Sequence, residues 1–227
     1  MKLYDNVKKG VFVSRPNRFI ANVEVDGQIK VCHVKNTGRC RELLIEGALV
    51  LLEKSSNSAR KTEYDLIAVY KGDKLINIDS QAPNKVFGEW VKNSGYFGEA
   101  TVVKPETTYN SSRFDYYIES ESKKIFVEIK GVTLEENGVV LFPDAPTERG
   151  IKHLNELVRA VGEGYSAYVF FIVQMEGCKY FTPNVKTHPE FAEALKNAEK
   201  NGVNVCCVEC KVFEDGFSVT DFLEVRL

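Results

Sequence analysis

One short stretch, Ser111–Lys130, constrains the fold more than any other part of the sequence. It carries Asp115 and, thirteen residues later, the triplet Glu128-Ile129-Lys130. Polar and apolar residues alternate on both sides of a turn at about residues 119–124, which predicts two neighbouring strands. Successive side chains of a strand point to opposite faces. We therefore expect Asp115, Glu128 and Lys130 on one surface, and these apolar residues facing a core: Phe114, Tyr116, Ile118, Val127 and Ile129.

Two carboxylates beside a lysine indicate a site for a hard divalent cation. Mg²⁺, or Mn²⁺ in its place, takes oxygen ligands and keeps waters and substrate phosphates in its shell. Such an ion activates water and neutralises charge on a phosphoryl group, so Asp115 and Glu128 are the expected metal ligands. Lys130 could hold or deprotonate the water. The same pattern is also typical of an exposed cross-strand salt bridge, worth roughly 0.2–1 kcal/mol.

The composition is that of a globular protein. The chain of 227 residues is 44% hydrophobic and 27% charged, enough for one large or two small domains. No apolar run approaches the roughly 20 residues of a membrane span. The N-terminal MKLYDNVKKG lacks an apolar segment after its lysines, so we expect no signal peptide and a cytoplasmic protein. The single pair Cys207 and Cys210 favours buried thiols over a zinc site.

Charge divides the chain into two parts. Residues 1–80 carry an excess of four positive charges, whereas the remainder carries an excess of six negative charges. A polyanion gripped by the first part and cut by the second is one interpretation. An ordinary solvated surface is the other.

The first part, residues 1–80, is predicted to be a small β-barrel such as an OB-fold. Short β-rich runs follow one another between turn signals, and Asp26-Gly27 indicates a tight hairpin. Cations of this part that could contact nucleic acid, or simply be solvated, are Arg15, Arg18, Lys35, Arg39, Arg41, Arg60 and Lys61.

The second part, residues 81–227, has the predicted order helix, three strands, helix, strand. The overall class is therefore α+β or α/β with two domains. The second helix is expected to begin near Thr147 and to bury one apolar stripe. Arg149, Lys152 and His153 are expected on its opposite side, where they could bind phosphate or form a hydrated face.

The order of elements in this second part, with Asp on the second strand and ExK on the third, resembles the core of the PD-(D/E)XK nuclease superfamily. More closely, the chain resembles the sugar fermentation stimulation protein A (SfsA) family over nearly its whole length. The longest and most specific matching segment is FPDAPTERGIKHL, which begins at Phe142. Further matches are Arg18–Val23, Asn36-Thr37-Gly38, Arg60-Lys61, Ser112–Asp115, Val127–Leu134 and Lys152–Leu154.

The resemblance implies an OB-like domain followed by a nuclease-like domain, DNA binding, a cytoplasmic location and a regulatory role in sugar metabolism, chiefly of maltose. By the superfamily pattern, Asp115 and Glu128 are metal ligands, Lys130 positions or activates water, and Glu89 is the auxiliary acid of the first helix, with Glu99 as a rival. Two departures stand out. Phe114 precedes Asp115 where a proline is typical, and Arg39-Cys40 replace the family's Ser-Met.

Three functions follow from these patterns. The first is a Mg²⁺-dependent nuclease, which a complete Asp, Glu and Lys set favours. The second is a non-catalytic DNA-binding regulator that uses the nuclease fold as a platform. A sugar-binding module is the third. We expect no membrane partner, and the patterns leave the oligomeric state open.

Overall fold

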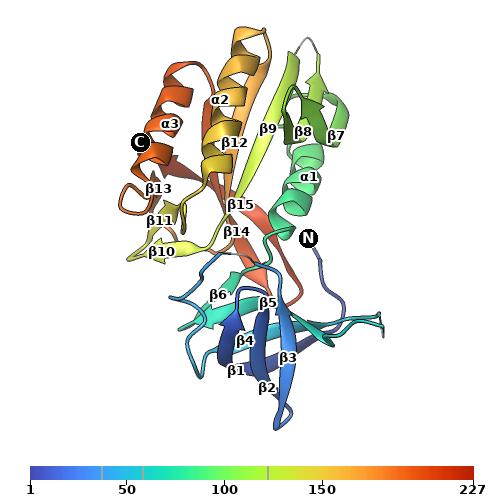
Figure 1. Cartoon of the computed structure of the whole chain (residues 1–227). Coiled ribbons are helices and arrows are strands. Elements are labelled where there is room, and N and C mark those ends of the chain that lie inside the picture. The colour runs from blue at the N-terminus through green and yellow to red at the C-terminus, as the bar shows by residue number, and fades with distance from the viewer. Residues whose placement is uncertain (37, 58, 122) are drawn as a thin grey trace.

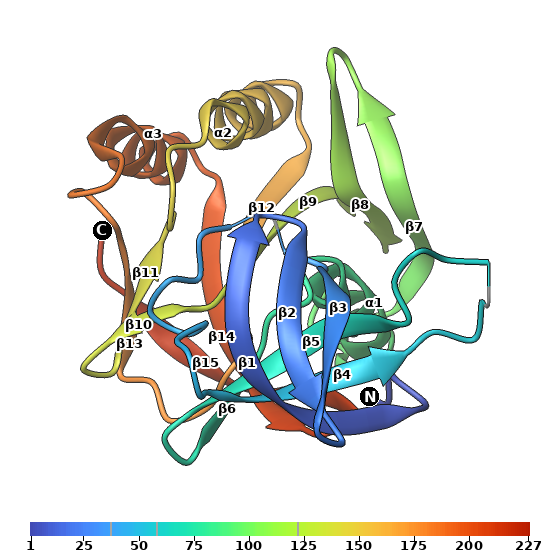
Figure 2. The same cartoon turned by 60° about the horizontal axis from the view of Figure 1, so that its bottom comes forward.

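The computed structural model describes residues 1–36, 38–57, 59–121 and 123–227, and it contains two sheets that form two domains (Figure 1). Thr37 and Ser58, which belong to the motif at Asn36 and to the polar loop before Arg60, lie outside the described residues. The first sheet has the order β3-β2-β1-β4-β5-β6, and an extra pairing of β3 with β5 closes strands β1 to β5 into the predicted barrel (Figure 2). Its strands are β1 (Val7–Asn17), β2 (Ile20–Val25), β3 (Gln28–Val34), β4 (Leu49–Lys54), β5 (Tyr64–Lys71) and β6 (Lys74–Asn77).

The barrel follows from turn chemistry and a buried central strand. Asp26 and Gly27 both have positive φ, at 51° and 75°, as the predicted hairpin between β2 and β3 requires. Strand β5 is buried along most of its length, because it pairs with β4, β6 and β3. The OB-like fold predicted for this part of the chain is therefore present.

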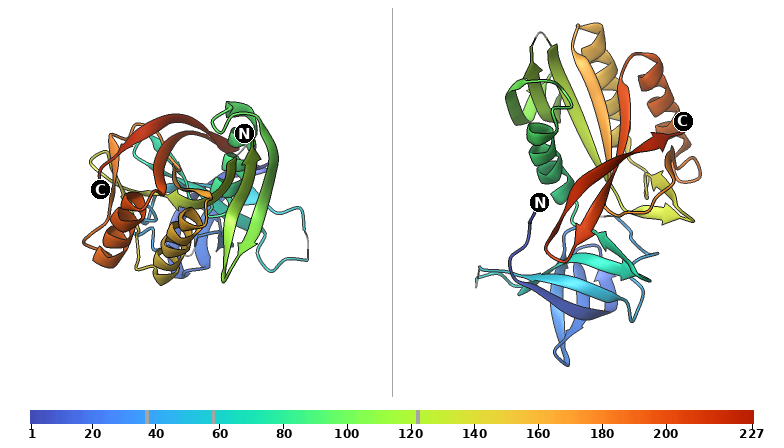
Figure 3. Two further views of the ribbon diagram at one scale, coloured as in Figure 1. Left: turned by 90° about the horizontal axis from the view of Figure 1, so that it is seen from above. Right: turned by 180° about the vertical axis from the view of Figure 1, so that it is seen from behind.

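The second domain is a nine-stranded sheet covered by helices on both faces (Figure 3). Helix α1 packs on one face, and α2 and α3 pack on the other. The helices are α1 (Ala82–Ser94), α2 (Glu148–Gly162) and α3 (Pro189–Lys200). The strands are β7 (Ala100–Tyr109), β8 (Ser112–Ser120), β9 (Lys123–Val132), β10 (Leu134–Glu136), β11 (Val139–Phe142), β12 (Ser166–Val173), β13 (Tyr180–Pro183), β14 (Asn204–Phe213) and β15 (Gly216–Val225).

Strand β12 lies at the centre of this domain. It pairs in parallel with β9 on one side and with β14 on the other. Its continuous apolar run is buried on both faces, as strands between two helical layers are. Cys207 and Cys210 on β14 are buried free cysteines, as predicted from the sequence.

Three features differ from the sequence prediction. Strands β10 and β13 were not expected, because each is only three or four residues long and depends on its neighbours. The N-terminal residues of the chain contact the second domain, since Leu3 N donates to Asp215 O at 2.8 Å. Phe114 packs on the α2 face, whereas Tyr116 and Ile118 pack on the α1 face. Pairing of β8 with β9 ends at Tyr116↔Val127, and beyond this point β8 twists away.

Buried polar groups join the two domains. Gln174 Nε2 donates to Asn77 Oδ1 at 2.8 Å and to the carbonyl of Asp79 at 3.1 Å. Within the first part of the chain, Lys35 Nζ lies 2.9 Å from Asp79 Oδ2. The bonds from Gln174 fix the barrel against the end of β12. No helix among the described residues is long and apolar enough to cross a membrane.

Gly131→Ala is expected to destabilise the protein by about 1–3 kcal/mol, since it overpacks this junction. A Cβ at Gly131 would lie 2.6 Å from Gln174 Oε1 and 2.8 Å from Pro83 Cγ. Urea unfolding gives the change in free energy. The matched control is Gly162→Ala at the end of α2, where a Cβ meets nothing within 4 Å. Equal stability of the two variants would contradict the close packing at this junction.

Candidate active site

The three residues predicted to share one surface meet at the end of the sheet that faces the barrel. Strand β9 places Glu128 and Lys130 on the α2 face, and the Lys130 Nζ donates to Glu128 Oε1 at 2.6 Å. Asp115 lies on β8 where that strand leaves β9, and its Oδ2 accepts from the backbone N of Ile129 at 2.7 Å. We call Asp115, Glu128, Lys130 and His153 the acidic cluster, because His153 Nδ1 is also bonded to Glu128 Oε1.

One carboxylate oxygen of Glu128 is hydrogen-bonded within the protein, and the other is not. Its side chain is almost fully buried, and Oε1 is bonded to both Lys130 and His153. Glu128 Oε2 is buried and has no hydrogen-bond partner among the described residues. An unsatisfied buried carboxylate oxygen is costly and rare. Such an atom is the expected mark of a site that binds something.

Asp115 is held so that its carboxylate stays close to Glu128. Asn84 Nδ2 donates to Asp115 Oδ1 at 2.7 Å, and the backbone of Ile129 holds the other oxygen. Burial, followed by the negative charge of Glu128, raises the pKa of Asp115 from 3.8 to about 6. Two hydrogen bonds and Lys130 oppose this rise without cancelling it.

Glu128 titrates in the opposite direction. Burial pushes the pKa of Glu128 up, but the charge of Lys130 and the bond from His153 together outweigh burial and lower it. The environments of the two carboxyl groups thus separate their pKa values, which is typical of functional sites. At neutral pH Glu128 is ionised.

His153 corrects the expectation of a helix-surface histidine. It is buried on α2, against the sheet, with its ring edge-on to Phe114 at 6.3 Å between centroids. Arg149 Nε donates to His153 Nε2 at 3.4 Å, so the Nδ1–H of the ring points at Glu128. The buried face of α2 includes Gly150, His153 and Leu154. The apolar stripe predicted for this helix did not include His153, because histidine is not an apolar residue.

Glu89 is not part of the cluster, contrary to the prediction. Its side chain is exposed on α1, five residues after Asn84 and so roughly 140° around the helix. The rival residue Glu99 is also exposed, beyond the end of α1. Asn84, in the first turn of α1, is the residue that reaches Asp115. The superfamily pattern predicts a carboxylate on this helix, so Asn84 was not among the predicted site residues.

The predicted basic contacts fall into two groups. Three of the cations are half-buried and engaged within the chain: Arg60 pairs with Asp65, Lys35 pairs with Asp79, and Arg15 donates to backbone carbonyls. Arg60 and Lys35 are therefore poor candidates for phosphate binding, because their charge is already neutralised. The side chains of the others are exposed: Arg18, Arg39, Arg41, Lys61, Arg149 and Lys152. Two of these exposed side chains also donate within the chain, Arg149 to His153 and Lys152 to the carbonyl of Ser111.

The donor set fits a hard divalent cation. Asp115 and the free Oε2 of Glu128 supply two carboxylates, and no further protein group is needed when water and phosphate oxygens complete the shell. Within the described ranges, no group of three or more His, Cys, Asp or Glu residues is arranged to hold a metal. In Mg²⁺ sites that also bind substrate phosphates, water and phosphate oxygens supply most of the ligands.

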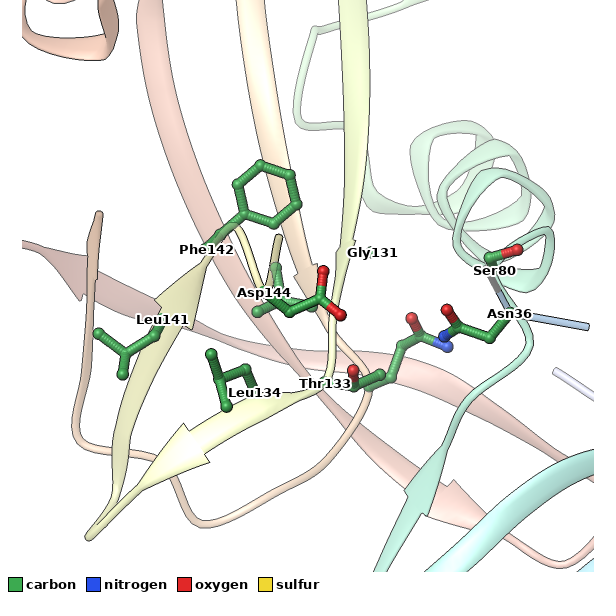
Figure 4. Close-up of a pocket in the computed structure, with 10 residues that line it drawn as sticks. Asn36, Ser80, Gly131, Thr133, Leu134, Leu141, Phe142 and Asp144 are labelled. Atoms are coloured by element: carbon green, nitrogen blue, oxygen red, sulfur yellow. The ribbon is translucent and has the colours of Figure 1, made fainter. Parts of the chain in front are cut away.

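A small hollow lies at the domain junction (Figure 4). It has a volume of about 90 Å³, and Gly131, next to Lys130, lines it. Asp144 and Asn36 approach it from opposite sides. Asp144 Oδ2 accepts from the backbone N of Arg39 at 2.9 Å, so this residue of the FPDAPTERG segment ties the barrel loop to the approach to α2.

The raised pKa of Asp115 predicts a pH-dependent cost of folding in metal-free protein. The folded protein binds this proton more tightly than the unfolded chain, so ionisation destabilises the fold as the pH rises from about 4 through about 6. Asp115→Asn removes this effect. Its stability relative to the wild type should rise by up to about 3 kcal/mol between about pH 4 and about pH 7. Urea unfolding in EDTA measures it, and a difference that does not change with pH would contradict the assignment.

Fold and site together define a two-domain protein, an OB barrel joined to an α/β domain whose elements follow a nuclease-like order. Two family models match the chain: the SfsA N-terminal OB domain over residues 13–78 and the sugar fermentation stimulation protein RE domain over residues 81–216. The chain belongs to the sugar fermentation stimulation protein (SfsA) family.

Relatives along the whole chain support this membership. A sugar fermentation stimulation protein homolog of Desulfitobacterium hafniense is 59% identical over 224 residues, covering 99% of this chain and 98% of the relative. One from Clostridium beijerinckii is 55% identical and covers 99% of both. A solved structure of Pyrococcus furiosus SfsA in complex with Ca²⁺ matches with a TM-score of 0.90 at 28% identity, over 100% of this chain and 98% of that one.

Proposed function

We propose that this protein is a divalent-metal-dependent phosphodiesterase that cuts nucleic acid, most readily DNA. The observation that carries the proposal is Glu128 Oε2, a buried carboxylate oxygen without a partner next to a second buried carboxylate. A bound Mg²⁺ or Mn²⁺ would activate water and neutralise charge on the phosphate. Exposed arginines of the barrel and of α2 supply positive charge for the polyanion.

The residues of the cluster have distinct roles in this proposal. Lys130 uses one of its three donors on Glu128, and its side chain is 15% exposed, so the remaining donors can hold a water or a phosphate oxygen. His153 and Lys130 keep Oε1 occupied, which turns Oε2 toward the site. Asn84 holds Asp115 in place from α1.

The matched Pyrococcus furiosus structure is described as a complex with Ca²⁺. Ca²⁺ is a hard cation that takes oxygen ligands, as Mg²⁺ does. This supports a cation site in the present chain. Metal-binding assays can use Ca²⁺ as a probe on the same grounds.

A non-catalytic DNA-binding regulator is the second candidate. The observation that favours it is that Lys130 already balances the charge of Glu128, while His153 is bonded to the same carboxylate oxygen. A cluster balanced in this way can stabilise the fold without turnover. Salt-sensitive DNA binding without cleavage would be its signature.

Cleavage assays separate the two functions. Purified full-length protein is incubated with single- and double-stranded DNA and RNA, in Mg²⁺, Mn²⁺ or EDTA. We expect metal-dependent cleavage that disappears in Asp115→Ala purified in parallel, with circular dichroism confirming its fold. Cleavage that survives in Asp115→Ala contradicts the site, and binding without cleavage in any metal favours the regulator.

A further inference from the structure

Two hollows on the barrel flank the junction hollow, and they differ in chemistry. The arginine hollow has a volume of about 400 Å³ and is lined by Arg15, Arg18, Arg39 and Arg41. The Phe19 hollow has a volume of about 360 Å³, and its walls include Phe19, His33, Lys35, Asn36, Arg60 and Asp65. Both are large enough to admit part of a nucleotide.

The arginine hollow concentrates uncompensated charge. None of its four arginines forms an ion pair with a carboxylate of the described residues. Arg15 is fixed by donating to the carbonyls of Gly38, Arg39, Arg18 and Asn36, at 2.7–3.0 Å. Holding like charges together is unfavourable unless an anion joins them. The guanidinium groups of the exposed arginines have the geometry to bind a phosphate.

The Phe19 hollow is neutral by comparison. Its cations are paired within the chain, Arg60 with Asp65 and Lys35 with Asp79, and His33 is also bonded to Asp65. Phe19 is 43% exposed, a large aromatic surface for a loop residue. A flat apolar ring beside paired hydrogen-bonding groups suits a nucleobase, which stacks on aromatic side chains and bonds at its edges.

Arg18 and Phe19 form the wall between the two hollows. The Arg18 guanidinium lies over the Phe19 ring, 4.8 Å from its centroid. Arg18 lines the arginine hollow, whereas Phe19 lines the other. A base on one side of this wall and its phosphate on the other would therefore belong to the same or adjacent nucleotides.

Contacts within the chain connect both hollows to the elements that carry the acidic cluster. Asn36 and Ser80 line the Phe19 hollow and the junction hollow, and Gln81 precedes α1, from which Asn84 reaches Asp115. On the other side, Arg39 is bonded to Asp144 in the segment before α2, from which His153 reaches Glu128. The residues that line the hollows are thus tied to the helices that hold the cluster.

We propose that the Phe19 hollow takes an unpaired base and the arginine hollow takes the adjoining phosphate, so that single-stranded nucleic acid is the bound form. A base inside a duplex is stacked and paired, and reaches such a hollow only by leaving the helix. This inference rests on the proposed function and names its substrate class.

Fluorescence anisotropy of the full-length protein in EDTA tests the inference. The probes are a short labelled DNA strand, its RNA equivalent and the corresponding DNA duplex. We expect at least one of the single strands to bind about tenfold or more tightly than the duplex. Phe19→Ala should weaken single-strand binding by about tenfold, as stacking on one side chain predicts, while Phe19→Trp should retain it. The matched control is Phe213→Ala, which removes a 36% exposed ring from the second domain.

Two outcomes overturn the inference while leaving the proposed function intact. One is duplex binding as tight as single-strand binding. The other is a Phe19→Ala variant that binds single strands as well as Phe213→Ala does. Failure to bind any of the three probes would instead remove the proposed function and the inference together.

Discussion

Glu128→Gln is expected to lower metal-dependent cleavage by about a thousandfold or more while the protein stays folded. The substitution keeps the size of the side chain but removes the charge that faces the site through Oε2. It also removes the charge that Lys130 balances, which adds to the loss of metal affinity. Single-turnover cleavage of a labelled strand in saturating Mg²⁺ measures the effect.

The matched control for Glu128→Gln is Glu135→Gln. Glu135 is also buried and charge-paired, since its Oε2 lies 2.9 Å from Lys71 Nζ, but it lies outside the acidic cluster. We expect Glu135→Gln to lower stability and to leave the cleavage rate within about threefold of the wild type. A Glu128→Gln variant that keeps more than about a tenth of the wild-type rate would contradict the assignment.

His153→Ala is expected to weaken divalent-cation binding by about 10–100-fold, the range for a residue that orients a metal ligand. His153 holds Oε1 of Glu128, and Arg149 fixes the tautomer of the ring. Without His153, the Glu128 carboxylate can rotate, and its free oxygen is no longer held toward the proposed metal site. Isothermal titration calorimetry with Ca²⁺ reads this directly and does not depend on catalysis.

His188→Ala serves as the control for His153→Ala. His188 is equally buried, at 5% exposure, but it caps α3 and contacts Thr147 and Glu148 instead of the cluster. We expect its Ca²⁺ affinity to stay within about threefold of the wild type. His153→Asn should recover part of the affinity, because an amide can still donate to Glu128. Equal losses in His153→Ala and His188→Ala would show a general effect of structure.

The order of elements and the core of the site were predictable from local patterns. Alternation around Val127 placed Glu128 and Lys130 on one face of a strand, and the structure has them there. The Asp26-Gly27 turn and the short β-rich runs predicted the barrel, which the fold contains. These signals are local, because periodicity of two residues and turn chemistry need no knowledge of distant contacts.

The site residues that were predicted wrongly are those whose partners are set by tertiary packing. Asn84 reaches Asp115 only because α1 crosses the end of β8, so an amide serves where an acid was expected at Glu89. Lys35 is neutralised by Asp79, which follows the last strand of the first sheet. His153 is buried because the sheet offers it Glu128 as a partner. None of these partners can be identified from the spacing of residues along the chain.

A crystal of this protein soaked in Mn²⁺ tests the central claim most directly, since anomalous scattering locates the ion without any assay. The account predicts one strong peak between Asp115 and Glu128, roughly 2.0–2.3 Å from Glu128 Oε2, with water completing the shell. A cluster that binds no Mn²⁺, with Glu128 Oε2 turned to a protein donor, would contradict it.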